Sequence, residues 1–295
     1  MSAGRPARPR LLYVTDLAYQ ARGRRYCDED IFLTSRLAAH FDLALCPPTA
    51  AAALMDGFDA VVVRNSGPVL AHQEAYRAFR DHALATGARV YNQLTGRADM
   101  AGKQYLIDLT EAGFPVIPTV DRAEDLHRLP AAERYVVKPR LGADSIGLEI
   151  VLADRLPDLA DRTVLVQPYV DLAYEVSFYF VDHDFQYALH APDPARRWRL
   201  ERYDPTADDL EFARRFIDWN AIEHGIQRVD ACRAPDGRLL LVELEDLNPY
   251  LSLDALTPET RDAFVVAMTE SVHRFLTGVR GPASATVHTK TTTNL

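Results

Sequence analysis

The segment YVVKPRLGADSIG, residues 135–147, carries a lysine at the end of an apolar run and then a loop with two glycines and a serine. Glycines let a loop bend sharply and bring backbone N–H groups against a phosphate. The glycine spacing matches a P-loop, but Leu148 occupies the position of the P-loop lysine, and the residues after it are typical of a strand rather than a helix. A P-loop is therefore excluded, whereas an ordinary hairpin loop stays open as the alternative. The candidate phosphate contacts are Lys138, Gly142, Ser145 and Gly147.

Lysine is rare in this chain, which makes its positions informative. Of the 33 basic residues, all except Lys103, Lys138 and Lys290 are arginines. An arginine does not replace a lysine where a compact ammonium group must meet a phosphate oxygen. Each lysine is therefore a candidate for a role that an arginine cannot perform.

Four charged side chains further along the chain alternate on two strand-like runs, which are joined by the tight turn at residues 235–237. Residues two apart on a strand share a face, so the three carboxylates are expected to converge beside the arginine. Such a cluster repels itself unless a cation is present, and Mg²⁺ accepts carboxylate oxygens together with substrate phosphates. A solvated sheet edge is the alternative, because the alternation fits it equally well. The four residues are Arg228, Asp230, Glu243 and Glu245.

The first ninety-odd residues alternate short strands and helices, which predicts a small open α/β domain. Strands are expected at residues 11–14, 42–46, 59–64 and 89–92, and helices at residues 29–40 and 73–85. No GxGxxG follows the first strand, so the dinucleotide-binding fingerprint is absent. Ligands gather at the carboxyl ends of parallel strands, and this edge is the expected substrate pocket, with turn capping as the alternative. The residues at this edge are Thr15, Asp16, Arg64, Asn65 and Ser66.

The rest of the chain predicts an α+β arrangement of hairpins and a few helices. Strands are expected at residues 134–138, 148–152, 163–170, 175–181, 185–190, 227–233 and 238–245, and helices at 98–112, 123–128, 207–223 and 258–276. The expected domains are an N-terminal α/β domain on the substrate side at 1–95, a small central lobe with the glycine loop at 96–166, a C-terminal lobe with the metal site at 167–280, and a disordered tail at 281–295.

Composition limits the class of protein. The chain has 295 residues, of which 48% are hydrophobic and 25% charged, and this excludes disorder as its main state. A net charge of −9 argues against nucleic acid and anionic membranes as partners, and no apolar run approaches the length of a membrane helix. Three scattered cysteines form no disulfide framework, which indicates a reducing cytoplasm. A homo-oligomer is left open.

The span from about residue 98 to residue 276 resembles the ATP-grasp superfamily, in particular its D-alanine–D-alanine ligase and glutathione synthetase types. Five pieces occur in the order of that family: Lys103 in the helix before GFPVIPT, then VVKPRLGADSIG, LVQPYV followed by Glu175, RVDACR, and VELEDLNP. Each piece alone is weak evidence, but the five in order are specific. Two of the three lysines also fall on the phosphate-binding lysine positions of the family.

The resemblance implies ATP and Mg²⁺ as cofactors and assigns roles to residues. Lys103 and Lys138 would contact the phosphates, and the loop from Gly142 to Gly147 would close over them. Arg228 would stabilise the transferring phosphoryl group. The adenine would be lined by Gln167, Pro168, Tyr169 and Val170, the ribose would meet Glu175, and the metal would be held by Asp230 and Glu243.

The chain departs from the family pattern at the last metal ligand. The family has Glu-x-Asn there, whereas this chain has Glu243 and Glu245, and Asn248 follows three residues later. We expect Glu245 to be the replacement ligand, with Asn248 as the second candidate for the metal and as a candidate substrate contact.

The implied function is that of an ATP-dependent ligase, which converts a substrate carboxylate into an acyl phosphate for attack by a nitrogen. The expected substrate is a small amino-acid-like molecule. Positioning and cationic clamps suit this chemistry, because the transferring group spreads negative charge over its oxygens. The alternatives are an intermolecular dipeptide-type ligase, a nucleotide-binding protein of the same fold without turnover, and a kinase that stops at a phosphorylated product.

Overall fold

The structure is a computed structural model that describes residues 7–21, 24–65, 72–140, 147–159, 164–193, 196 and 199–278. Gly142 and Ser145 of the expected glycine loop lie outside the described residues, as do Ser66 and the tail expected from residue 281.

A four-stranded parallel sheet in the order β4-β1-β5-β6 forms the N-terminal part and confirms the expected α/β alternation. The strands are β1 (Arg10–Thr15), β4 (Asp42–Cys46), β5 (Ala60–Asn65) and β6 (Val90–Tyr91). The helices are α1 (Cys27–Leu37), α2 (Ala51–Leu54) and α3 (Gln73–Thr86), and the short strands β2 (Gln20–Ala21) and β3 (Arg24–Arg25) precede α1. Buried alternate residues of β1 and β5 pack on both faces of this sheet.

A three-stranded antiparallel sheet in the order β8-β7-β9 forms the small lobe. Its strands are β7 (Arg134–Pro139), β8 (Glu149–Leu152) and β9 (Val164–Pro168), and two 3₁₀ helices, η5 (Ala123–Arg128) and η6 (Ala153–Leu159), accompany it. Buried side chains of β7 and β9 pack with Leu126 and Leu156 of these 3₁₀ helices. The expected domain boundary at residue 166 falls inside β9.

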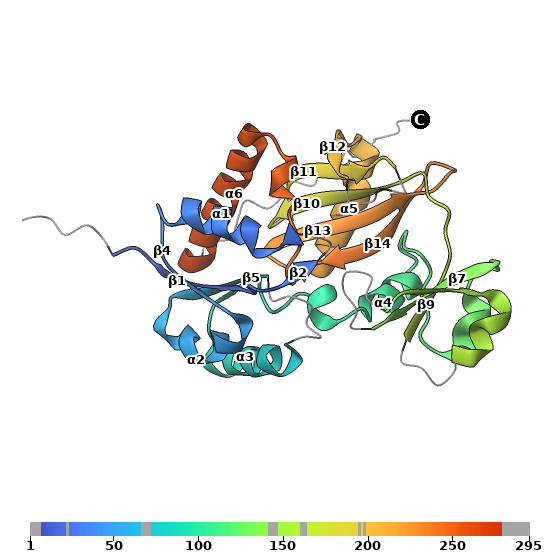
Figure 1. Cartoon of the computed structure of the whole chain (residues 1–295), viewed down its shortest axis with the longest axis horizontal. Coiled ribbons are helices and arrows are strands. Elements are labelled where there is room, and N and C mark those ends of the chain that lie inside the picture. Colours follow the sequence, from blue (N-terminus) through green and yellow to red (C-terminus); the bar gives the residue numbers. More distant parts are fainter. Residues whose placement is uncertain are drawn as a thin grey trace, which may run out of the picture.

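A five-stranded sheet in the order β12-β11-β10-β13-β14 forms the large lobe. Its strands are β10 (Tyr174–Val181), β11 (Asp184–Ala191), β12 (Glu201–Tyr203), β13 (Ile226–Arg233) and β14 (Leu239–Glu245), and its helices are α4 (Tyr105–Glu111), α5 (Ala207–Asn220) and α6 (Pro258–Thr277). In Figure 1, the edge strand β14 lies between the rest of this sheet and the green segment that holds α4, β7 and β9.

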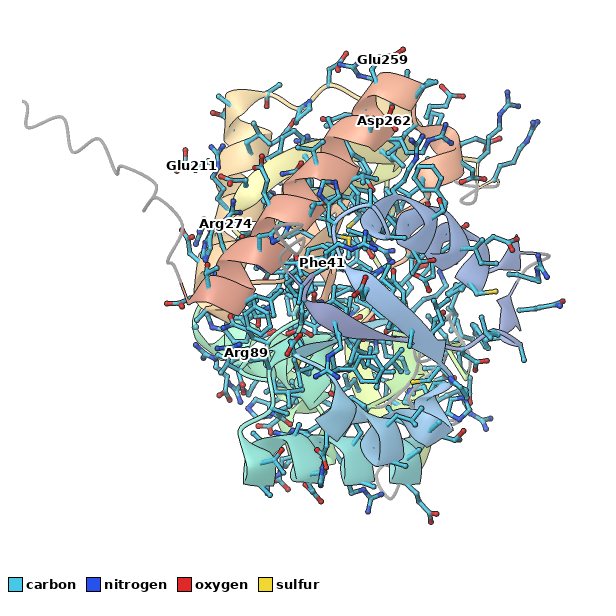
Figure 2. The ribbon with its side chains drawn as sticks, turned by 90° about the vertical axis from the view of Figure 1, so that its left-hand side faces the viewer. Phe41, Arg89, Glu211, Glu259, Asp262 and Arg274 are labelled. Carbon is cyan, nitrogen blue, oxygen red and sulfur yellow. The ribbon has the colours of Figure 1, made fainter. Side chains whose placement is uncertain are left out.

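Alternation along β10 explains how the lobes join. Its even-numbered residues, such as Phe178, pack against α4 and α5, whereas its odd-numbered residues, such as Tyr179, pack against α6 and the N-terminal sheet. The helices α1 and α6 lie side by side (Figure 1). Figure 2 labels Phe41, just after α1, and its ring centroid lies 4.5 Å from that of His273 on α6. The core of the N-terminal domain therefore continues into the large lobe.

Two expected helices are shorter than the sequence predicted. The one expected at residues 98–112 is a 3₁₀ turn, η4 (Asp99–Ala101), followed by Gly102 with φ of 87°, and α4 begins only at Tyr105. A left-handed glycine does not continue an α-helix, so Lys103 sits in an irregular link. The helix expected at 207–223 ends at Asn220, because Ala221 adopts a left-handed cap conformation. Strand β12 and helix α2 were not predicted.

Candidate active site

The β13–β14 hairpin brings the predicted charged residues together. Arg228 is paired with Glu245 and Asp230 with Glu243, so all four side chains lie on one face. Oxygen atoms of the three carboxylates lie within 4.8 Å of one another. The convergence that the alternation predicted is therefore present.

This carboxylate cluster fits a hard divalent cation. Three half-buried carboxylates supply the oxygen ligands that Mg²⁺ prefers. Burial raises the pKa of Glu245 to about 8, against the opposing effect of the Arg228 charge. A bound cation would favour the ionised form of this group and would relieve the repulsion among the three carboxylates.

Arg228 is held rigidly beside these carboxylates. Its Nε and Nη2 atoms donate to Asp230 over 2.9 and 2.8 Å, and Nη2 also donates to Glu245 over 2.5 Å. Its Nη1 atom donates to the carbonyl of Tyr250 over 2.7 Å. The guanidinium group therefore ties the candidate metal ligands to the loop that follows β14.

The two lysines approach the cluster from different elements. Lys103 is 5% exposed, and its Nζ pairs with Glu243 and lies 3.9 Å from Asp99. Lys138 stands on β7, where burial and the Lys103 charge lower the pKa of its amine to about 7, with Asp99 opposing. A polyanion bound here would relieve the repulsion between the two amines. No signal in the sequence pointed to Asp99, which lies outside every motif.

The small sheet offers an open face beside Lys138. Val136 is paired with Ile150 and with Gln167, and directly paired residues share a face of the sheet. Lys138, two residues after Val136 on β7, lies on the same face. On the same face Leu148, Ile150 and Leu152 are 40%, 53% and 58% exposed. This apolar surface next to an amine suits a planar base that carries phosphates.

The residues expected around the adenine are placed as follows. The side chain of Gln167 is 4% exposed and donates to Thr119 Oγ1 over 2.8 Å, so its amide is engaged internally. Pro168 ends β9, and Tyr169 donates its backbone N–H to the carbonyl of Arg134 over 2.9 Å. These three positions thus lie at the end of β9, where the chain leaves the small sheet. The two remaining positions are Val170, directly after them, and Glu175 near the start of β10.

Gly147 adopts φ of +75°, and a Cβ there would lie 2.9 Å from Pro139 Cγ, so this position requires glycine.

The expected substrate edge differs from the sequence-based picture. Thr15 is fully buried and donates to Asp30 over 2.6 Å. Arg64 is 3% exposed, lies 3.4 Å from Asp30 and 3.9 Å from Glu29, and donates to the carbonyl of Pro249 over 3.0 Å.

These groups form an internal polar cluster, so the structure does not support Thr15 and Arg64 as open pocket residues. Glu29 completes the cluster by accepting backbone N–H groups of Leu251 and Leu253 over 2.8 and 2.9 Å. Burial raises the pKa of Glu29 to about 7. The sequence signal that we missed is the pair of adjacent carboxylates in the first turn of α1.

Asp16 remains at the expected edge. It accepts backbone N–H groups of Ala18 and Tyr19 over 2.9 and 3.1 Å and pairs with His72 over 2.8 Å. Asn65 ends β5, and Asn248 follows β14 in a half-buried position.

A stack of tyrosine rings joins this edge to the candidate metal ligands. Tyr26 stacks on Tyr250 with ring centroids 4.7 Å apart, and Tyr19 meets Tyr26 edge-on at 5.2 Å. The carbonyl of Tyr250 accepts from Arg228. The loop after β14 therefore lies between Arg228 and the N-terminal domain.

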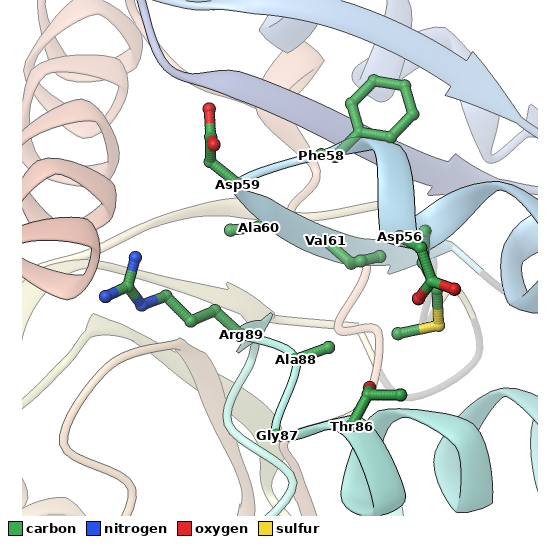
Figure 3. Close-up of a pocket in the computed structure, with 10 residues that line it drawn as sticks. Asp56, Phe58, Asp59, Ala60, Val61, Thr86, Gly87, Ala88 and Arg89 are labelled. Atoms are coloured by element: carbon green, nitrogen blue, oxygen red, sulfur yellow. The ribbon is translucent and has the colours of Figure 1, made fainter.

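A cavity of about 380 Å³ lies elsewhere in the N-terminal domain (Figure 3). It is lined by Asp59 and Ala60 at the start of β5 and by Arg89 just before β6. Parallel strands place their amino and carboxyl ends at opposite edges of a sheet, so this cavity faces away from Asp16. It is not part of the candidate site.

This fold and site define the class of protein: the chain has the ATP-grasp fold. It superposes on the ATP-grasp ligase PsnB with a TM-score of 0.60 and 17% identity, covering 87% of this chain and 98% of the other. It superposes on D-alanine–D-alanine ligase from Bacillus anthracis with a TM-score of 0.61 and 12% identity, covering 92% and 96%. The resemblance inferred from the sequence is confirmed, whereas no family model matches the chain.

The more specific likeness is to a protein of cycloserine biosynthesis. The chain is 27% identical over 235 residues to the cycloserine biosynthesis protein DcsG of Streptomyces lavendulae, covering 66% of this chain and 78% of that protein. It superposes on the crystal structure of D-cycloserine synthetase DcsG with a TM-score of 0.70 and 21% identity, covering 88% and 99%. These likenesses agree with the expected class of enzyme, an ATP-grasp ligase. Among the described residues, no helix is long and apolar enough to cross a membrane.

Proposed function

We propose that this chain is an ADP-forming ligase that uses ATP and Mg²⁺ to join a carboxylate carbon to a nitrogen. The observation that carries the proposal is the convergence of Asp230, Glu243 and Glu245 beside Arg228 and Lys103. A structural salt-bridge network gains nothing from a third carboxylate on the same face, whereas a metal-dependent phosphoryl transfer uses carboxylates of this kind to hold Mg²⁺ beside the phosphates.

The roles of the side chains follow from their charges and positions. Bound MgATP supplies the phosphoryl group that activates the substrate carboxylate. The residues that would hold Mg²⁺ are Asp230, Glu243 and Glu245, and Asn248 is the second candidate for the last ligand. Arg228 is fixed by its carboxylate partners before any substrate binds, so it stabilises developing negative charge without reorganisation.

The lysines would complete the phosphate site. When a nucleotide binds, its phosphates would attract the Lys138 amine and offset the repulsion from Lys103. The apolar face with Ile150 would cover the base. The loop from Gly142 to Gly147, most of which lies outside the described residues, would exclude water from the acyl phosphate.

We further propose O-ureido-D-serine as the substrate and its cyclisation to D-cycloserine as the reaction. The segment ELEDLNPYLSLD at residues 243–254, the length of the chain and its arginine-rich composition resemble D-cycloserine synthetase. The likeness to DcsG supports this reading. A nitrogen of the same molecule would attack its activated carbonyl, and intramolecular attack needs no second amino-acid site.

The substrate would lie between the metal site and the N-terminal domain. Asp16 and Asn248 border this region, and the Tyr26–Tyr250 stack joins its two sides. Asn65, which ends β5, stays a candidate at the same edge, and Ser66, which lies outside the described residues, stays a candidate from the sequence. The chemistry calls for a small amino-acid-like ligand rather than nucleic acid.

The test is ADP release from MgATP with O-ureido-D-serine alone. We expect saturable ADP release and one D-cycloserine per ADP, with no amine added. Activity that appears only when a second amino acid is present would instead identify a dipeptide-type ligase. Binding of nucleotide without ADP release for any amino acid would identify a non-catalytic protein. The Lys138→Met variant, purified in parallel, controls for contaminating ATPase.

A further inference from the structure

A buried carboxylate lies directly beyond β14, within the motif VELEDLNP, but neither the roles that the resemblance implies nor the proposed mechanism uses it. Asp246 is 0% exposed and follows Glu245 in the chain. Its Oδ1 atom accepts the backbone N–H of Met100 over 2.7 Å. Its Oδ2 atom accepts the backbone N–H of Ala98 over 3.1 Å and the side-chain amide of Asn220 over 3.1 Å. All three donors are buried or half-buried groups.

The turn that Asp246 holds leads directly to Lys103. Ala98 and Met100 belong to the segment around η4, and Lys103 follows before α4 begins. On the other side of Lys103, the hydroxyl of Tyr105 accepts the backbone N–H of Leu244 on β14 over 2.9 Å. Lys103 therefore sits between two anchors to the strand that carries Glu243 and Glu245.

A wider polar hub supports the same junction. Asn92 donates its amide to the carbonyl of Asp246 over 2.5 Å and to that of Ile226 over 2.8 Å. Asn220 accepts the backbone N–H of Arg97 over 2.6 Å and donates to Gln227 over 2.8 Å. Asn92, Asn220 and Gln227 are all buried. The hub thus fixes the segment from Asn92 to Met100 against the ends of β13 and β14.

The packing around Gly96 leaves no room for a side chain. A Cβ on Gly96 would lie 2.3 Å from Asp246 Oδ2 and 3.0 Å from Ile222 Cδ1. The carboxylate therefore meets the backbone of the link at a position that only glycine allows.

We propose that Asp246 is a positioning residue, which sets the distance between Lys103 and the metal carboxylates. The irregular link at Gly102 cannot hold Lys103 by helix geometry, so an external anchor must do so. Glu245 ends β14 and Asp246 follows it directly, so two adjacent residues carry the candidate metal ligand and the anchor of the phosphate-binding lysine. This inference rests on the nucleotide-binding part of the proposed function.

The variant Asp246→Asn tests the role with little change of shape. An asparagine offers one oxygen and one NH₂ group, so it can accept on one side only. Met100 on one side, or Ala98 and Asn220 on the other, then face a donor instead of an acceptor. The link should shift, and Lys103 with it. Supporting residues of this kind change metal affinity or activity by about 10–100-fold when they are mutated.

The measurement is the affinity for the non-hydrolysable nucleotide AMPPNP with saturating Mg²⁺, determined by calorimetry for four forms: wild type, Asp246→Asn, Lys103→Met and the double variant. We expect Asp246→Asn to weaken binding about tenfold or more, within the range for such residues. Because Asp246 acts through Lys103, adding Asp246→Asn to the Lys103→Met protein should weaken AMPPNP binding by less than about twofold. Equal effects in both backgrounds, or no effect in either, would overturn the proposal.

A matched control separates positioning from stability. Asp182 is also a buried carboxylate with several partners, since it accepts from Ser271 over 2.5 Å, from the Gly225 backbone over 3.0 Å and from Arg274 over 2.9 Å. Asp182→Asn should lower the free energy of unfolding without weakening AMPPNP binding more than about twofold. A comparable loss of affinity in Asp182→Asn would show that Asp246 acts through general stability, which contradicts the inference.

A second variant covers the case in which Asp246→Asn does not fold. Gly96→Ala keeps every hydrogen-bonding group but pushes on Asp246 Oδ2, and it should weaken AMPPNP binding in the same direction. Unchanged affinity in a folded Gly96→Ala protein would count against the proposal. If wild type itself fails to bind AMPPNP, the proposed function fails instead, so the two failures are distinguishable.

Discussion

Nucleotide binding should release protons at pH 6 and take up protons at pH 9. The amine of Lys138 has a pKa of about 7, which burial and the neighbouring Lys103 charge lower from its usual range. A bound triphosphate brings negative charge to this amine, which restores the protonated form. The carboxyl of Glu245 has a pKa of about 8, raised mainly by burial, and a bound Mg²⁺ ionises it.

The magnitude follows from these two values. At pH 9, about one proton is taken up by Lys138 and about 0.1 is released by Glu245, a net uptake of about 0.9. At pH 6, Lys138 is already about nine-tenths protonated and Glu245 releases about one proton, a net release of about 0.9. Uptake and release balance midway between the two pKa values, at about pH 7.5, so nucleotide affinity should fall as the pH rises above that point.

The assay is calorimetry of Mg·AMPPNP binding in buffers of different ionisation enthalpy at each pH. The slope of the observed enthalpy against buffer enthalpy gives the number of protons exchanged. Glu245→Gln should abolish the release at pH 6 and keep the uptake at pH 9. An exchange of the same sign at both pH values in wild type, or an uptake at pH 9 that vanishes in Glu245→Gln, would refute the reasoning.

Three further outcomes are expected. Lys138→Arg should lose most ADP release, because a planar guanidinium does not fit a point-charge site; near-normal turnover would remove the phosphate assignment. Glu243→Gln and Glu245→Gln should each raise the Mg²⁺ concentration needed for half-maximal activity, and Asn248→Ala should do so less; the reverse order would make Asn248 the last metal ligand. Arg64→Leu should lower the free energy of unfolding by about 3–5 kcal/mol in urea denaturation, because it leaves two buried carboxylates without their cation; a change below about 1 kcal/mol would show that the cluster is not held by this charge.

The sequence could predict those features of the fold and site that strand periodicity controls. Residues two apart on β13 and β14 share a face whatever the rest of the fold does, so the convergence of Asp230, Glu243 and Glu245 followed from alternation. The parallel strands of the N-terminal sheet followed from their short apolar runs and from the helices between them.

The part that could not be predicted depends on contacts between distant segments. Asp246 looks like one more charge in a run of acidic residues, and only the fold brings Ala98 and Met100 to it. Arg64 is the last but one residue of β5, at an edge where ligands usually bind, yet the carboxylates of α1 contact it instead. Lys103 was placed in a helix because local propensity does not report the left-handed Gly102.

The central claim is that a substrate carboxylate becomes an acyl phosphate in this site, and isotope transfer tests it most directly. O-ureido-D-serine labelled with ¹⁸O in both carboxylate oxygens would be incubated with MgATP, and the released phosphate analysed by mass spectrometry. One carboxylate oxygen attacks the γ-phosphorus and stays on it when the nitrogen displaces phosphate from the carbon. The account predicts one ¹⁸O atom in each phosphate formed with product, whereas unlabelled phosphate released together with D-cycloserine would contradict it.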